Sequence, residues 1–418
     1  MKNVDIVIVG GGPAGLAAAV SAKRHGADSI LILERDASLG GILNQCIHSG
    51  FGLHRFKEEL TGPEYAQRYI SLVEELEIPY LLGTTVIDIT HDRKVTAVNS
   101  EDGVIEIQAG AVIMAAGCRE RPAGAINIYG DRCTGIYTAG TAQKFVNIDG
   151  YMLGKKIIIL GSGDIGLIMA RRMTLEGAEV KAVIEIMPFS SGLNRNIVQC
   201  LNDFGIPLYL SHTVTSIKGD KRLESVTVAE VDQSLKPIKG SEREVECDTL
   251  LLSVGLLPEN EMSKRADVVL SGVTGGAVVN ERFETSTPGI FACGNVLHVH
   301  DLVDYVSEES ERAAKYAVDF VRGRTYAESD IQITPGSGVR YTVPFKINPH
   351  NIEDNLVIRF RVSTRYSDKR IRVLINGEPV MSRLEPALVP AEMQTAVISR
   401  EKLNAIPDIR DIVVEVGD

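Results

Sequence analysis

Residues 4–15 read VDIVIVGGGPAG: an apolar strand runs directly into a glycine-rich turn, and LAAAVSA at residues 16–22 continues as a helix. The arrangement recurs at residues 156–166, KIIILGSGDIG, where LIMA continues the helix. The first glycine of such a turn allows a tight bend, the second lets the backbone approach a ligand, and the third lets helix and strand pack closely. Each stretch therefore predicts the opening strand and helix of a doubly wound parallel sheet.

An acidic residue follows each turn at the spacing that a dinucleotide site requires. Glu34 ends the apolar strand at residues 30–33, and Glu185 ends the one at residues 180–184. The helix N-terminus offers N–H groups and a positive dipole to a pyrophosphate, and the carboxylate accepts a hydrogen bond from a ribose hydroxyl. A glycine-rich turn without a ligand is the alternative for one copy, but two complete copies predict two bound dinucleotides and electron transfer between them.

The composition indicates the general class to which the protein belongs. A hydrophobic share of 44% and a charged share of 24% are those of a soluble globular chain. A length of 418 residues predicts two or three domains. The net charge of −11 argues against binding to nucleic acid.

The six cysteines are scattered and form no CxxC pair, so we expect no metal site and reduced thiols of the cytoplasmic kind. No apolar run is long enough to span a membrane, and residues 1–2 lead directly into a strand, which leaves no room for a signal peptide. A cytoplasmic protein without a transmembrane segment is expected.

The two turns open two similar units, and the second interrupts the first. AVIMAAG at residues 111–117 closes the first unit after short strands at 85–89, 94–99 and 104–109, and TLLLSVG at residues 249–255 closes the second. TSTPGIFACGN at residues 285–295 returns to the first unit and precedes an amphipathic helix with Asp301 at the N-cap position.

The tail after residue 338 has a different pattern. Residues 334–338, TPGSG, predict a linker, and short alternating strands with an Asn376-Gly377 hairpin turn predict a small β-sandwich. The fold class is thus α/β: two Rossmann-like dinucleotide-binding domains, one inserted in the other, plus a C-terminal β-sandwich-like domain. The expected boundaries are 1–150 and 281–333 for the outer domain, 151–280 for the inserted domain and 339–418 for the tail.

This layout resembles the two-dinucleotide-domain flavoproteins of the pyridine nucleotide-disulfide oxidoreductase superfamily, over roughly residues 5–320. The resemblance implies FAD on the outer domain and NAD(H) on the inserted one. In the third FAD motif the family usually has Asp after Gly294, where this chain has Asn295, which can still hydrogen-bond a hydroxyl.

The resemblance implies two sets of cofactor-binding residues. For FAD they are Gly10, Gly12, Pro13, Ala14, Gly15, Glu34, Arg35, Gly41, Val86, Ala115, Ala116, Gly117, Gly294, Asn295 and Leu302. For NAD(H) they are Gly161, Gly163, Asp164, Ile165, Glu185 and Gly255. NAD(H) is favoured over NADP(H) because Glu185 would repel a 2′-phosphate and residues 186–189, IMPF, supply no arginine to receive one.

A narrower resemblance rests on GGILNQCIH at 40–48, LTGPEY at 60–65, GCRERP at 117–122, TAGTAQ at 138–143 and HVHDLVD at 298–304. These segments look like the oxidoreductase whose gene accompanies a glycerol-3-phosphate-dehydrogenase-like flavoprotein and a small cysteine-rich protein. Opine-oxidase and cyanide-synthase subunits are more distant relatives. The resemblance implies an oligomeric, multi-flavin complex with those two proteins as partners.

Cys46 and three histidines are the candidate catalytic residues. Disulfide reductases of the superfamily place two cysteines after the Leu-Gly-Gly turn, whereas here Cys46 stands alone in that segment. Cys46 could cycle through a sulfenic acid, or it is a packed thiol beside the cofactor. His298 and His300, and with a weaker argument His48, could exchange protons beside a flavin, or they pack beneath it.

Three functions follow as hypotheses. The first is an NADH:FAD oxidoreductase subunit that exchanges electrons with a partner flavoprotein dehydrogenase acting on a polyol phosphate or an amine. The second is a scaffold subunit with structural FAD, and the third is a self-contained NADH oxidase or peroxidase that uses Cys46. The tail is expected to dock another subunit, so that truncation after Thr334 leaves FAD bound; a cap on its own FAD domain is the alternative.

Overall fold

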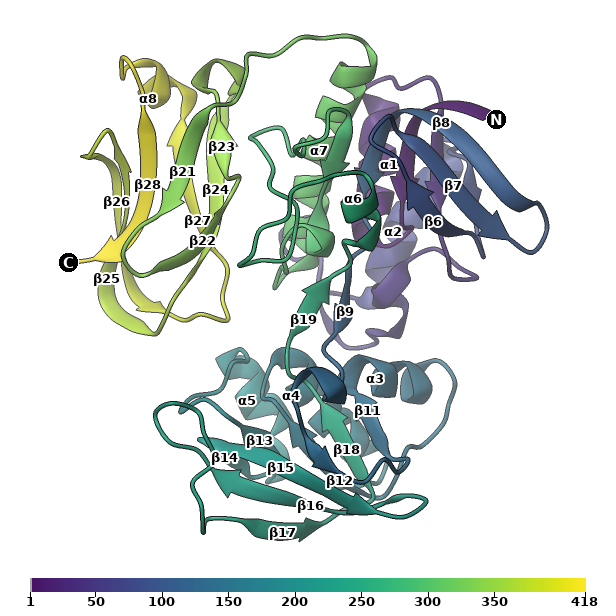
Figure 1. The fold of residues 1–418 in the computed structure, drawn as a ribbon, viewed down its shortest axis with the longest axis vertical. Coiled ribbons are helices and arrows are strands. Elements are labelled where there is room, and N and C mark those ends of the chain that lie inside the picture. Colours follow the sequence, from purple (N-terminus) through teal and green to yellow (C-terminus); the bar gives the residue numbers. More distant parts are fainter. Residues whose placement is uncertain (1) are drawn as a thin grey trace. The chain divides into compact units, whose positions relative to one another are not determined.

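A computed structural model describes residues 2–418 of the chain. It divides into two compact units: the chain up to Cys118 together with Pro258–Asp418, and Arg119–Leu257. Figure 1 shows the elements of both units. The expected boundaries after residues 150 and 280 fall inside these units, because β11 (Ile136–Thr138) and α3 (Ala139–Asn147) pack with the inserted unit, whereas α6 (Glu261–Arg265) packs on the outer one.

The outer unit is built on a seven-stranded sheet. Its strands run in the order β5-β2-β1-β8-β7-β6, with β20 paired to the end of β8. The strands are β1 (Lys2–Val9), β2 (Ile30–Leu33), β5 (Tyr80–Leu81), β6 (Thr85–Ile89), β7 (Lys94–Asn99), β8 (Gly103–Met114) and β20 (Ile290–Ala292). β1, β2, β5, β20 and the end of β8 are parallel, and the apolar runs of all but the edge strand β5 are buried on both faces.

One strand is longer than the sequence indicates. The expected strand at 104–109 and the closing run from residue 111 form the single strand β8, because its first part pairs antiparallel with β7 and its end pairs parallel with β1 and β20. Its end at Met114 places the segment Ala115–Gly117 at the carboxyl edge of the sheet, beside the first glycine turn.

Helices cover this sheet. α1 (Pro13–Arg24), which carries a run of buried alanines, packs on α7 (Val303–Val321), and α2 (Gly62–Glu75) contacts α1. α2 begins with a capping box: the Thr61 hydroxyl accepts a hydrogen bond from Glu64 N, and the Glu64 carboxylate accepts one from Thr61 N. A short ribbon of β3 (Ser49–Phe51) and β4 (Leu60–Thr61) precedes α2.

The inserted unit repeats the plan. Its five-stranded sheet is parallel throughout, in the order β11-β18-β12-β13-β14, and a second sheet has the order β10-β15-β16-β17. The elements not yet bounded are β10 (Tyr129–Gly130), β12 (Lys156–Leu160), α4 (Asp164–Leu175), β13 (Glu179–Glu185), α5 (Asn194–Cys200), β14 (Leu208–Leu210), β15 (His212–Gly219), β16 (Leu223–Glu230), β17 (Arg243–Glu246) and β18 (Thr249–Leu252). The connecting segments β9 (Cys118–Glu120) and β19 (Leu256–Pro258) pair with each other.

The C-terminal domain is a β-sandwich, as expected. One sheet has the order β23-β21-β28-β25-β26 and the other β22-β24-β27, and their apolar faces share one core. The elements are β21 (Ile331–Pro335), β22 (Val339–Val343), β23 (Lys346–Ile347), β24 (Asn355–Val362), β25 (Tyr366–Ile375), β26 (Glu378–Leu388), β27 (Gln394–Ser399), α8 (Arg400–Asn404) and β28 (Asp411–Gly417). Asn376 and Gly377, both with positive φ, form the expected hairpin turn.

The prediction of a linker at residues 334–338 is wrong for its first two residues. Thr334 and Pro335 belong to β21, which pairs in parallel with β28, so the sandwich begins at Ile331. The pairing partner lies about eighty residues further along the chain, and nothing in the local composition indicates it. Pro335 is tolerated because it is the last residue of its strand.

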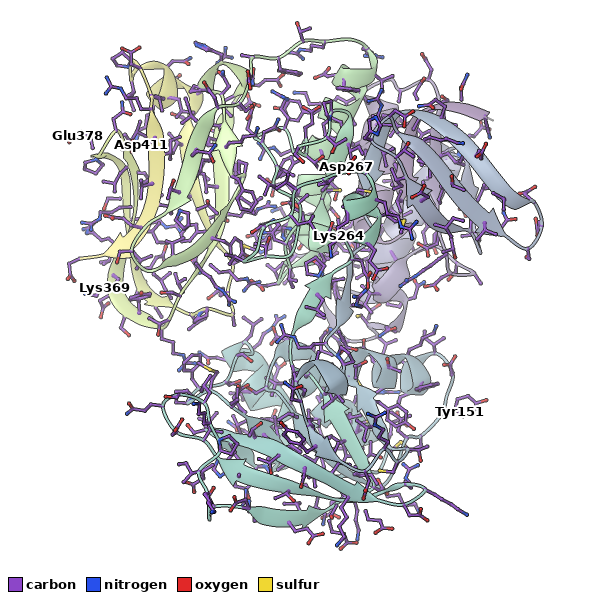
Figure 2. All side chains as sticks on the ribbon, viewed as in Figure 1. Tyr151, Lys264, Asp267, Lys369, Glu378 and Asp411 are labelled. Atoms are coloured by element: carbon purple, nitrogen blue, oxygen red, sulfur yellow. The ribbon has the colours of Figure 1, made fainter. Side chains whose placement is uncertain are left out.

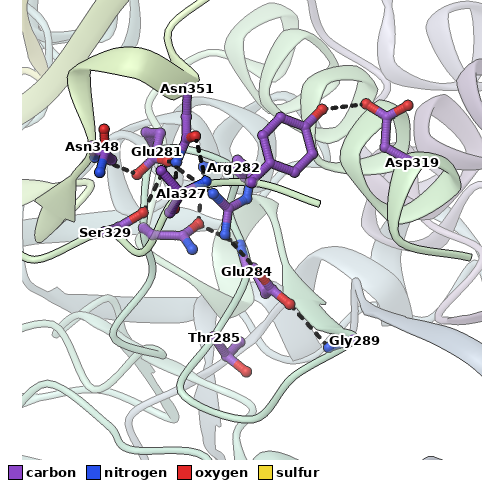
Figure 3. Close-up of polar contacts among 12 residues, drawn as sticks. Glu281, Arg282, Glu284, Thr285, Gly289, Asp319, Ala327, Ser329, Asn348 and Asn351 are labelled. Atoms are coloured by element: carbon purple, nitrogen blue, oxygen red, sulfur yellow. Dashed lines mark hydrogen bonds and ion pairs between the residues drawn. The ribbon is translucent and has the colours of Figure 1, made fainter. Parts of the chain in front are cut away.

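The sandwich packs on the outer domain. Tyr341 and Val343 of β22 join the core of the outer domain, and Phe345 N donates to Val279 O at 3.0 Å. Figure 3 shows a second attachment: the buried Glu281 carboxylate accepts hydrogen bonds from Ser329 Oγ at 2.9 Å and Asn351 Nδ2 at 2.7 Å. The sandwich thus caps its own outer domain, which was the alternative to a docking module.

Among residues 2–418, none of the helices combines the length and the apolar character needed to cross a membrane.

Candidate dinucleotide sites

The first glycine turn has the close approaches that its motif predicts. Gly10 has φ of +108°, and a Cβ there would lie 2.6 Å from Ala115 O. A Cβ on Gly15 would lie 1.8 Å from Gly10 O, so only glycine lets α1 start this close to β1. Both positions are therefore required by the fold itself.

The middle glycine of each turn is different. Gly12 has φ of −78° and Gly163 has φ of −64°, both ordinary for any residue. A Cβ would meet its nearest atom at 3.9 Å on Gly12 and at 3.6 Å on Gly163, which is unstrained contact. The folded chain has room for alanine at both positions, so a ligand that approaches the backbone there accounts for glycine.

Each acidic residue holds the backbone of its turn. Glu34 Oε2 accepts from Gly11 N at 2.6 Å, and Glu185 Oε2 accepts from Ser162 N at 3.0 Å. Their other oxygens accept from Asp36 N and Met187 N, two residues beyond each acid. The two carboxylates are buried and stand in the same relation to their turns, which is the arrangement that presents an acid to a ribose.

The second turn follows the first in detail. A Cβ on Gly161 would lie 2.0 Å from Ser253 O, and one on Gly166 would lie 2.6 Å from Gly161 O. Asp164, in the first turn of α4, accepts from Leu193 N at 2.8 Å and Asn196 Nδ2 at 2.6 Å. Both donors bind the same oxygen, Oδ1, and Ile165 follows Asp164 in α4.

Other residues predicted for FAD converge on the first turn. A Cβ on Gly41 would lie 2.9 Å from the Gly12 Cα, and one on Gly294 would lie 2.8 Å from the Ala14 Cβ. Thr84 N donates to Glu34 O at 2.8 Å, which brings the start of β6, with Val86, near the acid. Ala115, Ala116 and Gly117 follow β8, Pro13 opens α1, and Arg35 is exposed just after Glu34.

The segment before α7 departs from expectation at Asp301. The N-cap of α7 is Leu302, and no side chain caps the helix there. Asp301 instead pairs with Arg361 of β24 and accepts from Met393 N. The N-cap prediction is wrong because an ion pair from the sandwich takes the carboxylate.

Asn295 shapes the same segment. Its Oδ1 accepts from His300 N at 2.9 Å, and its Nδ2 lies 3.7 Å from Cys118 Sγ. The amide oxygen retains a second lone pair, so a hydroxyl could still bind there.

His298 and His300 meet on one carboxylate. Their Nε2 atoms lie 2.8 Å and 3.2 Å from the two oxygens of Glu309, and all three side chains are fully buried. Burial lowers the pKa of His300 to about 4, against the pull of Glu309. The His300 imidazole is therefore neutral near pH 7, which suits hydrogen bonding rather than proton donation from a cation.

Cys46 and His48 lie in the segment that follows the Leu-Gly-Gly turn. The Cys46 thiol donates to Ile42 O at 3.3 Å, and burial raises its pKa to about 12. A Cβ on Gly62 would lie 2.8 Å from the Cys46 Cβ, so this thiol packs against the start of α2. His48 contacts the ring of Phe51. A raised pKa is the opposite of what an activated thiolate requires.

Glu309 and Arg359 are residues of this region that the sequence analysis missed. Glu309 Oε1 also accepts from Gly294 N at 2.8 Å, and Oε2 also lies 3.2 Å from the Arg359 guanidinium of β24. One signal was available: Glu309 falls between Val306 and Ala313 on the apolar face of the helix, where an acid must have partners. Its partner fifty residues away carries no such signal.

The sequence also matches a known family. Residues 4–318 match the pyridine nucleotide-disulphide oxidoreductase family. The chain belongs to this family. Members of the family bind FAD and NAD(P)H, which agrees with the two turns and their acids. The match ends before β21, so the sandwich lies outside it.

Individual relatives agree with the assignment. Mitochondrial dihydrolipoyl dehydrogenase of Caenorhabditis elegans is 28% identical over 333 residues, 71% of this chain and 64% of that protein. Hydrogen cyanide synthase subunit HcnB of Pseudomonas protegens is 25% identical over 285 residues, 63% of this chain and 59% of that protein. This chain thus spans less than two thirds of the length of these two relatives.

Solved structures show the same fold. Thioredoxin reductase of T. acidophilum has a TM-score of 0.64 at 25% identity, covering 78% of this chain and 100% of that one. An NAD-dependent persulfide reductase from A. fulgidus has a TM-score of 0.60 at 20% identity, covering 90% of this chain and 68% of that one. The second likeness concerns the fold alone.

Proposed function

We propose that this chain is an FAD-dependent NADH oxidoreductase subunit that passes electrons between NAD(H) and a partner flavoprotein dehydrogenase of the glycerol-3-phosphate or amine type. The observation that carries the proposal is the pair of middle glycines: Gly12 and Gly163 have ordinary φ values and room for a Cβ, beside buried acids that hold each turn. Two such cradles in one chain support two dinucleotides in one reaction.

The residues of the outer unit fit FAD. Gly12 and Ala14 at the start of α1 would face its pyrophosphate, Glu34 would accept from a ribose hydroxyl, and the segment 294–302 would border the remainder. Bound FAD would supply the redox chemistry by accepting electrons from the nicotinamide and passing them on. The protein's part is to hold and orient the two cofactors.

The residues of the inserted unit favour NAD(H). Glu185 stands at the end of β13, where the adenosine ribose of the coenzyme binds in this motif. Its carboxylate would accept a hydrogen bond from the 2′-hydroxyl of NAD(H) and would repel the 2′-phosphate of NADP(H). Residues 186–189 provide no cation to bind that phosphate.

Two rival functions have less support. A peroxidase or oxidase that uses Cys46 needs an activated thiolate, whereas burial raises the pKa of this thiol. A scaffold that no longer binds NAD(H) would not explain why position 163 is glycine although the fold has room for a Cβ there. It would also not explain why Glu185 still holds its turn.

The partner is proposed on two grounds. Some relatives are subunits of larger enzymes by name, among them a protein of hydrogen cyanide synthase and one of alkyl hydroperoxide reductase. The sandwich also has an edge strand, β26, which begins at the exposed Glu378 and is largely exposed along its length (Figure 2). An exposed edge offers backbone hydrogen bonds to a partner, so docking is assigned to this edge while the other side of the sandwich caps the outer domain.

Substitution of the two middle glycines tests the proposal. NADH mixed anaerobically with the purified, FAD-loaded protein should bleach the visible flavin absorbance. Gly163→Ala should keep the fold and FAD but weaken NADH binding, because its methyl group fills the approach to the pyrophosphate. Gly12→Ala should keep the fold and lose FAD. Rapid bleaching by NADH in Gly163→Ala, or none in the FAD-loaded wild type, would overturn the assignment.

A further inference from the structure

The Glu309 carboxylate joins two parts of the chain that the family match separates. Oε1 accepts from Gly294 N at 2.8 Å and lies 3.2 Å from His300 Nε2. Oε2 lies 2.8 Å from His298 Nε2 and 3.2 Å from Arg359 Nη1. A carboxylate has about four acceptor sites, so all of them are used. Three donors come from the segment 294–300, and the fourth comes from the sandwich.

These side chains resemble a metal site in composition, but their hydrogen bonds point to another role. The ligand atoms of His298, His300 and Glu309 lie within 4.8 Å of one another. The guanidinium of Arg359 is a fixed positive charge on the carboxylate, and each oxygen already has two donors. A divalent cation would have to displace those donors and lie beside a cation.

Several contacts fix the Arg359 side chain in this position. Its side chain is 6% exposed, and it also pairs with Glu308 at 3.1 Å and donates to Tyr305 O at 3.2 Å. Its guanidinium lies over the Tyr305 ring at 5.3 Å. A buried cation persists only when it is paired, and these partners all belong to α7.

Arg359 compensates the negative charge of Glu309 within this buried cluster. Burial disfavours ionisation of Glu309, but the two imidazoles hold its pKa well below the usual carboxyl range. The other groups that face the cluster are Glu308, Tyr305 and Arg312 on α7, Cys293 before the segment, and Tyr341 on β22. Arg359 is the buried cation in contact with the carboxylate, so its removal leaves a buried negative charge beneath the segment.

We propose that Arg359 is a positioning residue of the flavin site, contributed by the C-terminal sandwich: it compensates Glu309, which in turn holds the segment from Gly294 to His300 in the conformation that receives FAD. Gly294 lies against Ala14 of the first turn, so a shift of this segment reaches the predicted FAD cradle directly. The inference rests on the FAD site of the proposed function. It makes the sandwich part of that site, beyond the family's own fold.

The test compares four single variants of the full chain and one double variant. Arg359→Met removes the charge and keeps the length, Arg359→Lys keeps a charge, and Glu309→Gln removes the carboxylate charge. Arg372→Met is the control, because Arg372 pairs with Glu415 inside the sandwich at 2.9 Å. FAD affinity of the deflavinated protein is measured by calorimetry, and thermal unfolding reports on folding.

Arg359→Met should weaken FAD binding by about tenfold or more, the loss expected when one partner of a buried charged hydrogen bond is removed. Arg359→Lys should recover part of the affinity, and Arg372→Met should match the wild type. In a Glu309→Gln background, Arg359→Met should have little further effect, because the charge that it compensates is gone.

A second readout needs no flavin. ¹⁵N spectra of the FAD-free protein follow the titration of His300, whose pKa the Arg359 charge helps to lower. Arg359→Met should raise that pKa, and Arg372→Met should not. Unchanged FAD affinity and an unchanged His300 titration in Arg359→Met would overturn the inference, whereas failure of the wild type to bind FAD would overturn the proposed function instead.

Discussion

Cys46 is a residue for which the structure favours one of two interpretations that the sequence leaves open. Its thiol donates to Ile42 O, its Cβ packs on Gly62, and burial raises its pKa. These contacts describe a packed thiol rather than a nucleophile. The sequence could identify the position, because Cys46 follows the Leu-Gly-Gly turn, but the burial that sets its reactivity depends on α2.

Cys46→Ser should therefore leave electron transfer from NADH intact. We expect the rate of flavin reduction to stay within about twofold of the wild type, since no step uses a thiolate. Stopped-flow absorbance under anaerobic conditions measures it, with Cys200→Ser, a buried thiol of the inserted unit, as the control. Loss of peroxide turnover specific to Cys46→Ser would revive the peroxidase hypothesis.

Glu185 should govern the choice of coenzyme. The wild type should bind NADPH at least about tenfold more weakly than NADH, a difference of about 1.4 kcal/mol from charge repulsion at the 2′-phosphate. Glu185→Gln should reduce the difference in affinity between NADH and NADPH, because it removes the charge while its amide oxygen still accepts from Ser162 N; the acceptor that Met187 N uses is lost. Competition binding of both coenzymes to the FAD-loaded protein measures the ratio, and equal affinities in the wild type would contradict the prediction.

Among the elements, α2 shows how a local signal and a distant contact combine. Its capping box at Thr61 and Glu64 and its Pro63 can be recognised in the sequence. Its fastening to α7 cannot: Tyr65 Oη lies 2.8 Å from Ser307 Oγ, and these residues are separated by 242 positions. Helix starts are set by neighbouring residues, whereas the face that a helix buries is set by the whole fold.

Thr61→Ala should destabilise the outer domain modestly. Loss of an N-cap side chain costs about 1 kcal/mol, so a small fall in the unfolding midpoint is expected with FAD still bound. Chemical denaturation followed by circular dichroism measures it, and Thr90→Ala, whose hydroxyl makes hydrogen bonds within the turn between β6 and β7, shows the cost of losing a threonine hydroxyl outside a helix cap. A loss of several kcal/mol, or of FAD, would mean that Thr61 does more than cap the helix.

For the whole molecule, the sandwich is the part whose role depends most on tertiary contacts. Glu281 and Asn351 fasten it to the outer domain, Tyr341 enters the outer core, and Arg359 reaches Glu309. A module that only docked a partner would need none of these contacts. The sandwich therefore has a side that caps its own domain and an exposed edge at β26.

Truncation after Asp330 should lower both the unfolding midpoint and FAD retention. The cut leaves Glu309 without its cation and uncovers the surface that Tyr341 and Val343 contact. Flavin content after gel filtration and a thermal melt provide the measurement. If the truncated protein keeps its FAD and unfolds at the wild-type midpoint, the sandwich serves only to dock a partner.

Both glycine turns, their acids and the sandwich class could be predicted from the sequence because each has a local pattern, and the inserted arrangement could be predicted because its motifs recur in order along the chain. The turn at Gly10 and Gly15 and its acid Glu34 lie within one strand–helix–strand unit, and hydrophobic spacing there encodes the local structure directly. The pairing of β21 with β28, the capture of Asp301 by Arg361 and the four donors on Glu309 were decided by tertiary contacts. Burial and long-range pairing determine which partner a charged side chain meets, and residues fifty positions apart share no local pattern that could record it.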